Sequence, residues 1–167
     1  MTQPEMSFTP EQITALFIDA ARNGENDLVK QFLEAGMPAD CADSRGYTPL
    51  IVATYNDQLD TACLLLDNGA DPNGVDAKGA TALSGVAFKG YEAIARLLLE
   101  RGAHIDQANH AGRTPLMFAI MFGRQGMARL LLEHGANPDI RDAEGLSARD
   151  LAHRQGLGSL FAEETAR

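Results

Sequence analysis

The chain has 167 residues, a formal net charge of −9 and no tryptophan, so we expect an acidic globular protein for which nucleic-acid binding is unfavourable. Its two cysteines lack CxxC spacing, which suggests neither a disulfide framework nor a zinc site and favours a reducing, cytoplasmic setting. The opening MTQPEMSF has neither a basic flank nor an apolar stretch, and no run approaches the roughly 20 apolar residues of a membrane span, so we expect neither a secretory signal nor membrane association.

The first predicted element is a helix that begins at Thr9-Pro10-Glu11-Gln12. This T-x-x-Q sequence can form a capping box, and proline at the first helical position has no N–H that would need a partner. The following segment, ALFIDAARNGENDLVKQFLEAG, contains glycines at 24 and 36 that match glycines of later segments in register. It is therefore a divergent first copy of a unit that recurs further along.

Three clearer copies of this unit follow. The segments GYTPLIVAT (46–54), GATALSGVA (79–87) and GRTPLMFAI (112–120) begin at glycines spaced 33 residues apart, and Gly145 continues the series. Leucine triplets at 64–66, 97–99 and 130–132 keep the same interval. A fixed period of this length is typical of a repeat protein.

The unit that begins at Gly112 predicts two short helices. Thr114 can cap the first helix, Pro115 occupies its first position, and Gly123 supplies the left-handed residue that ends it. A second helix is expected over about 125–134, with its three leucines facing inward. A projecting turn of roughly nine residues then leads to the next unit.

Such a helix pair is too short to be stable alone, because isolated helices below about 12 to 15 residues are marginal in water. Stacking of neighbouring units is therefore required, and the leucine triplets supply the shared core. The expected product is an all-α, one-dimensional solenoid in which each unit contacts only its neighbours.

The 33-residue period, the T-P-L helix start and the L-L-L-x-x-G-A ending resemble the ankyrin repeat family over nearly the whole chain. The resemblance implies a single ankyrin domain over 1–167, built of stacked helix-turn-helix units with projecting β-turns. Its units are an N-terminal capping repeat at 8–42, full repeats at 43–75, 76–108 and 109–141, and a C-terminal capping repeat at 142–167.

Several positions depart from the family pattern. The histidine of the family's TPLH sequence is replaced by Ile51, Ser84 and Met117, so its inter-repeat hydrogen bonds are not expected here. Gly85 lies inside a predicted helix, which costs roughly 1 kcal/mol relative to alanine and predicts a soft repeat. Asp57 stands where other units have glycine, which predicts mild backbone strain.

The resemblance also implies where a partner binds, because ankyrin stacks recognise partners with their projecting turns and the concave side of their first helices. Carried onto this sequence, these positions give the candidate partner-binding residues Arg22, Arg45, Tyr47, Tyr55, Asn56, Lys78, Phe88, Lys89, His110, Arg113, Met121, Phe122 and Arg154.

The candidate set is rich in aromatic and basic side chains. Four of the chain's ten aromatic residues belong to it, on positions expected to face water in the free protein. Together with the arginines and lysines they indicate a protein partner with an acidic and partly apolar surface, although turn acids such as Asp43 and Asp76 would reduce the positive excess. The alternative is that Phe88, Met121 and Phe122 fold back and merely cover the stack.

These observations favour a non-catalytic protein-binding module without cofactor or metal. The four histidines have neither HxxxH nor HExxH spacing, Ser84 is not in a G-x-S-x-G motif, and no phosphate-binding loop is present.

By resemblance, small free-standing bacterial ankyrin proteins act as accessory, stress-linked or neutralising partners of a neighbouring gene product. An enzyme or small-ligand protein remains an alternative. A monomer is expected, and self-dimerisation through the apolar residues of the candidate set is an alternative.

Overall fold

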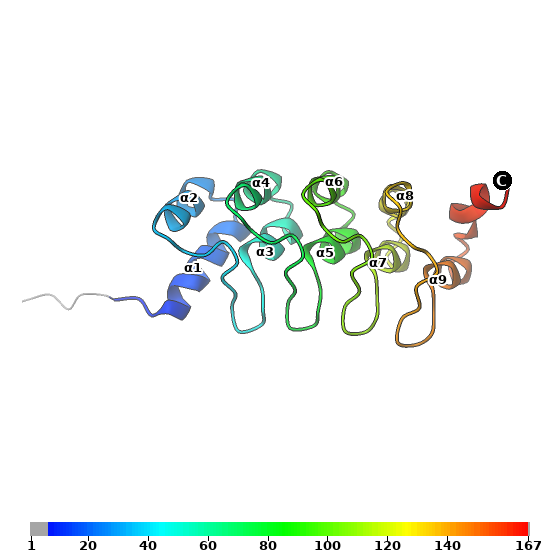
Figure 1. Ribbon diagram of the computed structural model, residues 1–167, viewed down its shortest axis with the longest axis horizontal. Coiled ribbons are helices and arrows are strands. Elements are labelled where there is room, and N and C mark those ends of the chain that lie inside the picture. Colours follow the sequence, from blue (N-terminus) through cyan, green and yellow to red (C-terminus); the bar gives the residue numbers. More distant parts are fainter. Residues whose placement is uncertain (1–6, 167) are drawn as a thin grey trace, which may run out of the picture.

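Pairs of antiparallel helices stack side by side in the computed structural model, which describes residues 7–166, with side chains through residue 162 (Figure 1). The inner row consists of α1 (Pro10–Arg22), α3 (Pro49–Tyr55), α5 (Ala82–Lys89), α7 (Pro115–Met121) and α9 (Ala148–Arg154). The outer row consists of α2 (Asn26–Glu34), α4 (Leu59–Asp67), α6 (Glu92–Glu100) and α8 (Gln125–Glu133), and a 3₁₀ helix, η1 (Gly158–Ala166), ends the described chain. The predicted all-α repeat solenoid is confirmed.

The starts of the inner helices follow from local sequence. Thr48, Thr81 and Thr114 each accept a hydrogen bond from the backbone N–H three residues later. Thr9 and Gln12 form the predicted capping box at the start of α1. Each cap satisfies a backbone donor that has no partner inside the helix, which stabilises the helix by about 1 kcal/mol.

The turns between paired helices require a left-handed residue. Gly90 and Gly123 have φ angles of 82° and 69° at this point, and Asp57 has φ 60° at the equivalent point of its unit. Asp57 is the one non-glycine residue with positive φ in the described part of the chain. Asp57 thus adopts the left-handed conformation on which the predicted strain depends, since a side chain in this conformation is disfavoured.

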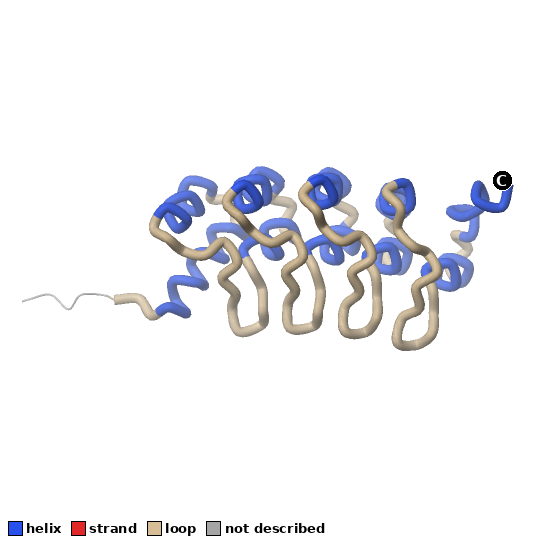
Figure 2. Tube along the Cα trace, viewed as in Figure 1, coloured by secondary structure: helices blue, strands red, loops and turns tan. Residues whose placement is uncertain are grey.

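The long connections between units project to one side as a row of similar loops (Figure 2). Each loop is held by an Asp or Asn side chain that accepts two backbone N–H groups; the first three are Asp43, Asp76 and Asn109. Neighbouring loops are joined by backbone hydrogen bonds, such as that from the N–H of Ala77 to the carbonyl of Arg45 at 2.9 Å. These bonds fix the spacing of the loops along the stack.

The core lies between the two rows of helices. The middle leucine of each triplet, Leu65, Leu98 or Leu131, is completely buried. Leu132 also packs against this core, although it is only half-buried. It lies at the edge of the inward face of α8, because successive helical residues are rotated by about 100°.

The three positions where the family carries histidine have different roles in this chain. Met117 is completely buried in the core. The hydroxyl of Ser84 lies 3.1 Å from that of Thr81, and Ile51 is half-buried. Apolar packing and a local hydroxyl pair therefore occupy the space of the inter-repeat histidine.

The last unit differs from the others in its second helix. The sequence predicts an α-helix here, whereas Gly158–Ala166 forms the 3₁₀ helix η1. Phe161 anchors this segment to the core, and the guanidinium of Arg149 lies 4.8 Å from the centroid of its ring. Phe161, together with Leu160, holds the segment in place of the leucine triplet of the preceding units.

Candidate functional site

Three aromatic side chains form a continuous row across the middle of the stack, which we call the aromatic strip: Tyr55, Phe88 and Phe122. Tyr55 and Phe88 are stacked, with ring centroids 6.2 Å apart, and Phe88 meets Phe122 edge to face at 4.4 Å. Tyr55 ends α3, Phe88 lies one residue before the end of α5, and Phe122 directly follows α7. Tyr55 and Phe88 are one 33-residue period apart, whereas Phe122 stands one position beyond Met121, the residue that the period relates to them. Aromatic pairs with this geometry contribute about 0.5 to 1.5 kcal/mol beyond the burial of their area.

The two ends of the aromatic strip are open to solvent. Tyr55 is 42% exposed and Phe122 is 47% exposed, whereas Phe88 and the neighbouring Met121 are half-buried. The prediction that Tyr55 and Phe122 face water is confirmed. Phe88 and Met121 also contribute to covering the inner helices, as the alternative interpretation expected.

Gly85 is what allows Tyr55 to lie where it does. A Cβ atom built on Gly85 would be 3.2 Å from Cδ2 of Tyr55, closer than ordinary van der Waals contact. The tyrosine ring therefore occupies the space of the missing side chain and lies against the backbone of α5. Gly85 therefore does more than lower the helix propensity of α5, because the absence of its side chain leaves room for Tyr55 of the aromatic strip.

Two cations lie over aromatic faces in this region. Nζ of Lys89 is 4.6 Å from the centroid of the Tyr55 ring, and the guanidinium carbon of Arg45 is 4.8 Å from that of Tyr47. Each contact contributes about 0.5 to 1 kcal/mol at an exposed site. They hold positive charge beside the apolar strip.

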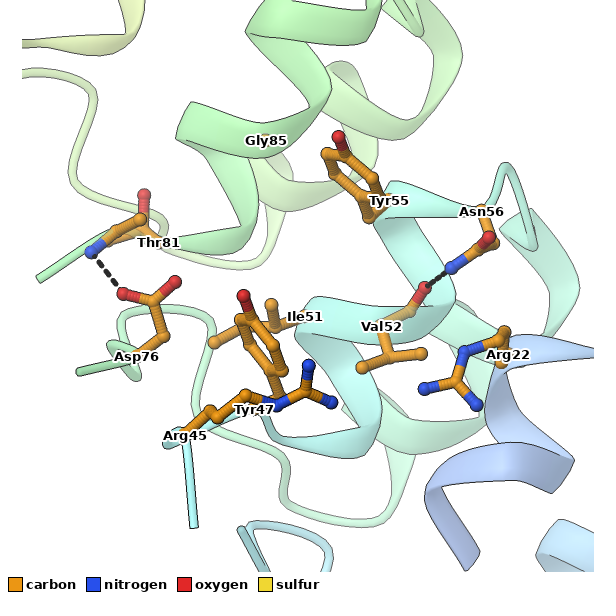
Figure 3. A pocket seen from close by; sticks show the side chains of 11 residues that line it. Arg22, Arg45, Tyr47, Ile51, Val52, Tyr55, Asn56, Asp76, Thr81 and Gly85 are labelled. Atoms are coloured by element: carbon orange, nitrogen blue, oxygen red, sulfur yellow. Dashed lines mark hydrogen bonds between the residues drawn. The ribbon is translucent and has the colours of Figure 1, made fainter. Parts of the chain in front are cut away.

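A cavity of about 350 Å³ adjoins the aromatic strip, and Tyr55 belongs to both. Figure 3 shows its lining, which comes from the last turn of α1, the first two projecting loops, α3, and the beginning of α5. The lining residues are Arg22, Arg45, Tyr47, Ile51, Val52, Tyr55, Asn56, Asp76, Ala80, Thr81 and Gly85. We call this cavity the arginine pocket.

Five candidate residues predicted from the sequence meet in the arginine pocket: Arg22, Arg45, Tyr47, Tyr55 and Asn56. The amide of Asn56 donates a 2.8 Å hydrogen bond to the carbonyl of Val52 and is thereby fixed in direction. The apolar residues beneath them, including Ile51 and Val52, were not among the residues predicted from the sequence. The one signal that could have pointed to this place is Gly85, a glycine inside a helix.

The acids of the projecting loops reduce the positive charge of this face, as the sequence analysis allowed. Asp43 lies 3.5 Å from the guanidinium of Arg45, and Asp76 lines the arginine pocket. Arg113 lies 3.9 Å from the buried carboxylate of Asp142 and 3.8 Å from the exposed carboxylate of Glu144.

The remaining candidates lie outside the pocket and the strip. Lys78 and His110 are exposed on neighbouring loops, joined by a 3.0 Å bond from the N–H of His110 to the carbonyl of Lys78. Arg154 is exposed at the end of α9. The structure thus brings together the candidates of α1, α3, α5 and α7 and leaves these three on the periphery.

Within residues 7–162, no group of three or more His, Cys, Asp or Glu side chains could hold a metal ion. None of the helices described between residues 7 and 166 is long and apolar enough to span a membrane.

Comparison with known families gives one match. The family described as ankyrin repeats (three copies) matches residues 3–76 and 68–142, which together span most of the chain. A search of the curated proteins gave no significant match. Ankyrin repeats are in general protein–protein interaction modules and typically have no catalytic activity of their own. With its stacked helix pairs and this match, the chain belongs to the ankyrin repeat family.

Proposed function

We propose that this protein is a non-catalytic binding module that holds a protein partner against the aromatic strip and the adjoining loops. Its capping units at 8–42 and 142–167 enclose three full repeats in a single domain. The centre of the binding surface consists of Arg22, Arg45, Tyr47, Tyr55, Asn56, Phe88, Lys89, Met121 and Phe122. The surface extends along the loops and toward the C-terminal end through Lys78, His110, Arg113 and Arg154.

One observation carries this proposal: the rings of the aromatic strip are in continuous contact, and Tyr55 and Phe122 at its two ends are exposed to solvent. Monomeric proteins tolerate scattered apolar residues on the surface, whereas contiguous apolar patches mark interaction sites. Tyrosine and phenylalanine are enriched at the centres of interfaces because they provide a large contact area and have few torsions to fix.

The charges around the strip indicate the kind of partner. Lys89 and Arg45 lie over aromatic faces next to the apolar surface, and Arg22 borders the same region. The rest of the chain is strongly acidic, since the net charge is −9. A partner whose surface combines apolar and acidic side chains complements this region and is repelled by the remaining surface.

The experiment is a pull-down from native cell extract, read by mass spectrometry, with wild-type protein and the double variant Tyr55→Ala/Phe88→Ala. Loss of two central aromatic anchors is expected to lower affinity by about 2 kcal/mol or more, or roughly 30-fold. The matched control is Leu28→Ala/Leu59→Ala, which removes two exposed leucines from the outer helices α2 and α4.

A protein retained by the wild type and the control but lost from the aromatic variant would identify the partner and support the strip. Equal retention by all three forms would show that the strip is only a cover on the stack. Sedimentation of the purified protein distinguishes a third result. A dimer that dissociates on Phe88→Ala/Phe122→Ala would mean that the strip pairs with a second copy of the chain.

A further inference from the structure

We infer that the arginine pocket anchors an acidic side chain, Asp or Glu, from a peptide segment of the partner, with an apolar neighbour in that segment lying on the aromatic strip. This inference rests on the proposed function and specifies the partner chemistry at one end of the surface. It follows from the positions of the two arginines, the apolar floor of the pocket, and its continuity with the strip.

Two guanidinium groups border the pocket from different units. Arg22 comes from the end of α1 and Arg45 from the first projecting loop, and Figure 3 shows them approaching Val52 from opposite sides. The backbone of Arg22 is fixed by a 3.0 Å hydrogen bond from Nε2 of Gln58 to its carbonyl. Stacking on the Tyr47 ring orients Arg45. Planar guanidinium groups are suited to bidentate binding of a carboxylate.

Both arginines are paired within the free protein, but only with partners that can be exchanged. Arg22 pairs with Asp19 on its own helix, and Arg45 lies 3.5 Å from Asp43 in its own loop. The Arg22 and Asp19 side chains are 39% and 57% exposed, and the Arg45 side chain is 67% exposed. Asp43 is only 21% exposed and is held by its own loop, but its 3.5 Å separation from Arg45 is long for an ion pair. Solvent-exposed ion pairs contribute about 0 to 1 kcal/mol, and each guanidinium has five N–H donors, so an incoming carboxylate can be bound without a large loss.

The pocket also contains a carboxylate of its own, which limits what can bind. One oxygen of Asp76 accepts the N–H groups of Lys78 and Ala80, at 2.8 and 2.9 Å. These bonds hold the carboxylate on the α5 side of the pocket, whereas the two arginines come from α1 and the preceding loop. An acidic side chain is therefore expected to enter at the arginine side.

The floor of the pocket is apolar and is formed by Ile51, Val52 and Gly85. A carboxylate carried on a CH₂ or CH₂CH₂ stem matches this combination, because the stem lies on the apolar floor while the head meets the guanidinium groups. A cavity of about 350 Å³ is at the small end of the range for ligand sites, which is compatible with an anchoring side chain and its neighbours.

Continuity with the aromatic strip favours a peptide segment over a free carboxylic acid. Tyr55 is at once a wall of the pocket and the first ring of the strip. A chain that places an acidic residue between the arginines can therefore place an apolar residue against Tyr55 and Phe88. A small acid would leave this exposed apolar surface uncovered.

The experiment selects binders from a phage library that displays random peptides inside a flanked loop, with purified full-length protein as target. The test variant is Arg22→Gln/Arg45→Gln. The matched control, Arg96→Gln/Arg129→Gln, makes the same change of charge at exposed arginines of α6 and α8. Thermal unfolding of all three proteins checks that they are folded.

Wild type and control are expected to enrich peptides with Asp or Glu next to an apolar residue, and the test variant is not. A synthetic selected peptide should bind the test variant at least about tenfold more weakly than wild type, as expected for a lost charged hydrogen bond. Changing the acid of the peptide to its amide should cause the same loss on wild type and little further loss on the test variant. Amidation of the peptide's C-terminus should change nothing.

The inference would be overturned if the wild type selected no peptide, or if the selected peptides lacked acidic residues. It would also be overturned if the test variant enriched the same peptides, or if binding depended on the free C-terminal carboxylate of the peptide and not on its acidic side chain. The pull-down separates this inference from the proposed function. A cellular partner lost with Tyr55→Ala/Phe88→Ala but fully retained by Arg22→Gln/Arg45→Gln would overturn the anchor and leave the strip. Retention by both variants would overturn both.

Discussion

Asp57 is the residue at which the chain departs most clearly from its own repeat. It adopts φ 60° where Gly123 has φ 69°. An L-residue in the left-handed region is disfavoured, although Asp tolerates it better than most. We therefore expect Asp57→Gly to raise the free energy of unfolding by up to about 1 kcal/mol, the strain relief being partly offset by the greater entropy of glycine in the unfolded chain. Urea denaturation measures this difference.

The reciprocal change provides the control. No atom lies within 4 Å of a Cβ built on Gly123, so Gly123→Ala tests the backbone alone. It should lower the free energy of unfolding by about 1 kcal/mol, because alanine is disfavoured at positive φ. Opposite signs for the two substitutions are expected, and a destabilising Asp57→Gly would show that the Asp57 side chain stabilises the turn more than the strain costs.

Cys41 is the residue with the largest predicted pH effect. Burial, together with the nearby carboxylate of Asp40, raises the pKa of its thiol from 9.0 to about 11. The thiolate is the reactive species, so at pH 8 Cys41 should react with a disulfide reagent about a hundredfold more slowly than a thiol of pKa 9.0. A Cys63→Ser protein isolates this reaction, and its rate should keep rising toward pH 11.

The same shift affects stability in a defined direction. Between pH 9 and 11 the unfolded chain loses the Cys41 proton and the folded chain retains it, so this group's contribution to stability is present below pH 9 and is lost as the pH rises through 11. Wild type should lose stability more steeply across this range than Cys41→Ser. Parallel curves for the two proteins would contradict the raised pKa.

At the scale of the element, helix α5 contains Gly85, a residue of low helix propensity that makes room for the Tyr55 ring. Gly85→Ala should improve helix propensity by up to about 1 kcal/mol, while the new Cβ, 3.2 Å from the Tyr55 ring, requires the ring to move. Because Tyr55 is 42% exposed, it can move outward. We expect unchanged or higher stability by thermal unfolding, together with weaker binding of the pulled-down partner. Lower stability with unchanged binding would mean that Tyr55 is not part of the site.

The element starts could be predicted from sequence because their causes are local. The threonine caps, the prolines at the first helical positions and the left-handed turn residues each act on their immediate neighbours in the chain, and the repeat shows them several times. The 3₁₀ form of η1 was not predicted, since its contacts depend on how Phe161 meets the end of the stack. Local sequence does not encode that contact.

The sequence predicts where the candidate residues lie along the stack, but not which of them meet in space. The repeat period relates Tyr55, Phe88 and Met121 on the concave side, whereas the ring that meets Phe88 in the structure is that of Phe122, one position further along. The arginine pocket combines residues of three successive units, and its apolar floor is formed by side chains that sequence alone assigns to helix packing. Its shape depends on the distance between loops and helices, which hydrogen bonds between units determine.

At the scale of the whole molecule, stability depends on contacts between adjacent units, because the helices are too short to persist alone. Leu98 is completely buried in α6 of the central unit. Leu98→Ala should lower the free energy of unfolding by about 2 to 5 kcal/mol, a large part of the roughly 5 to 15 kcal/mol typical of a domain. Urea denaturation checks the size of the loss.

The location of Leu98 adds a second expectation, since the central unit joins the two halves of the stack. Hydrogen exchange should become faster in α5 and α6 and in the units on both sides, because each unit depends on its neighbours. Lys89→Ala, on the inner row of the same unit, removes only a cation contact with Tyr55 and should cost less than about 1 kcal/mol. A loss from Lys89→Ala as large as that from Leu98→Ala would mean that the binding face and the core are coupled in stability.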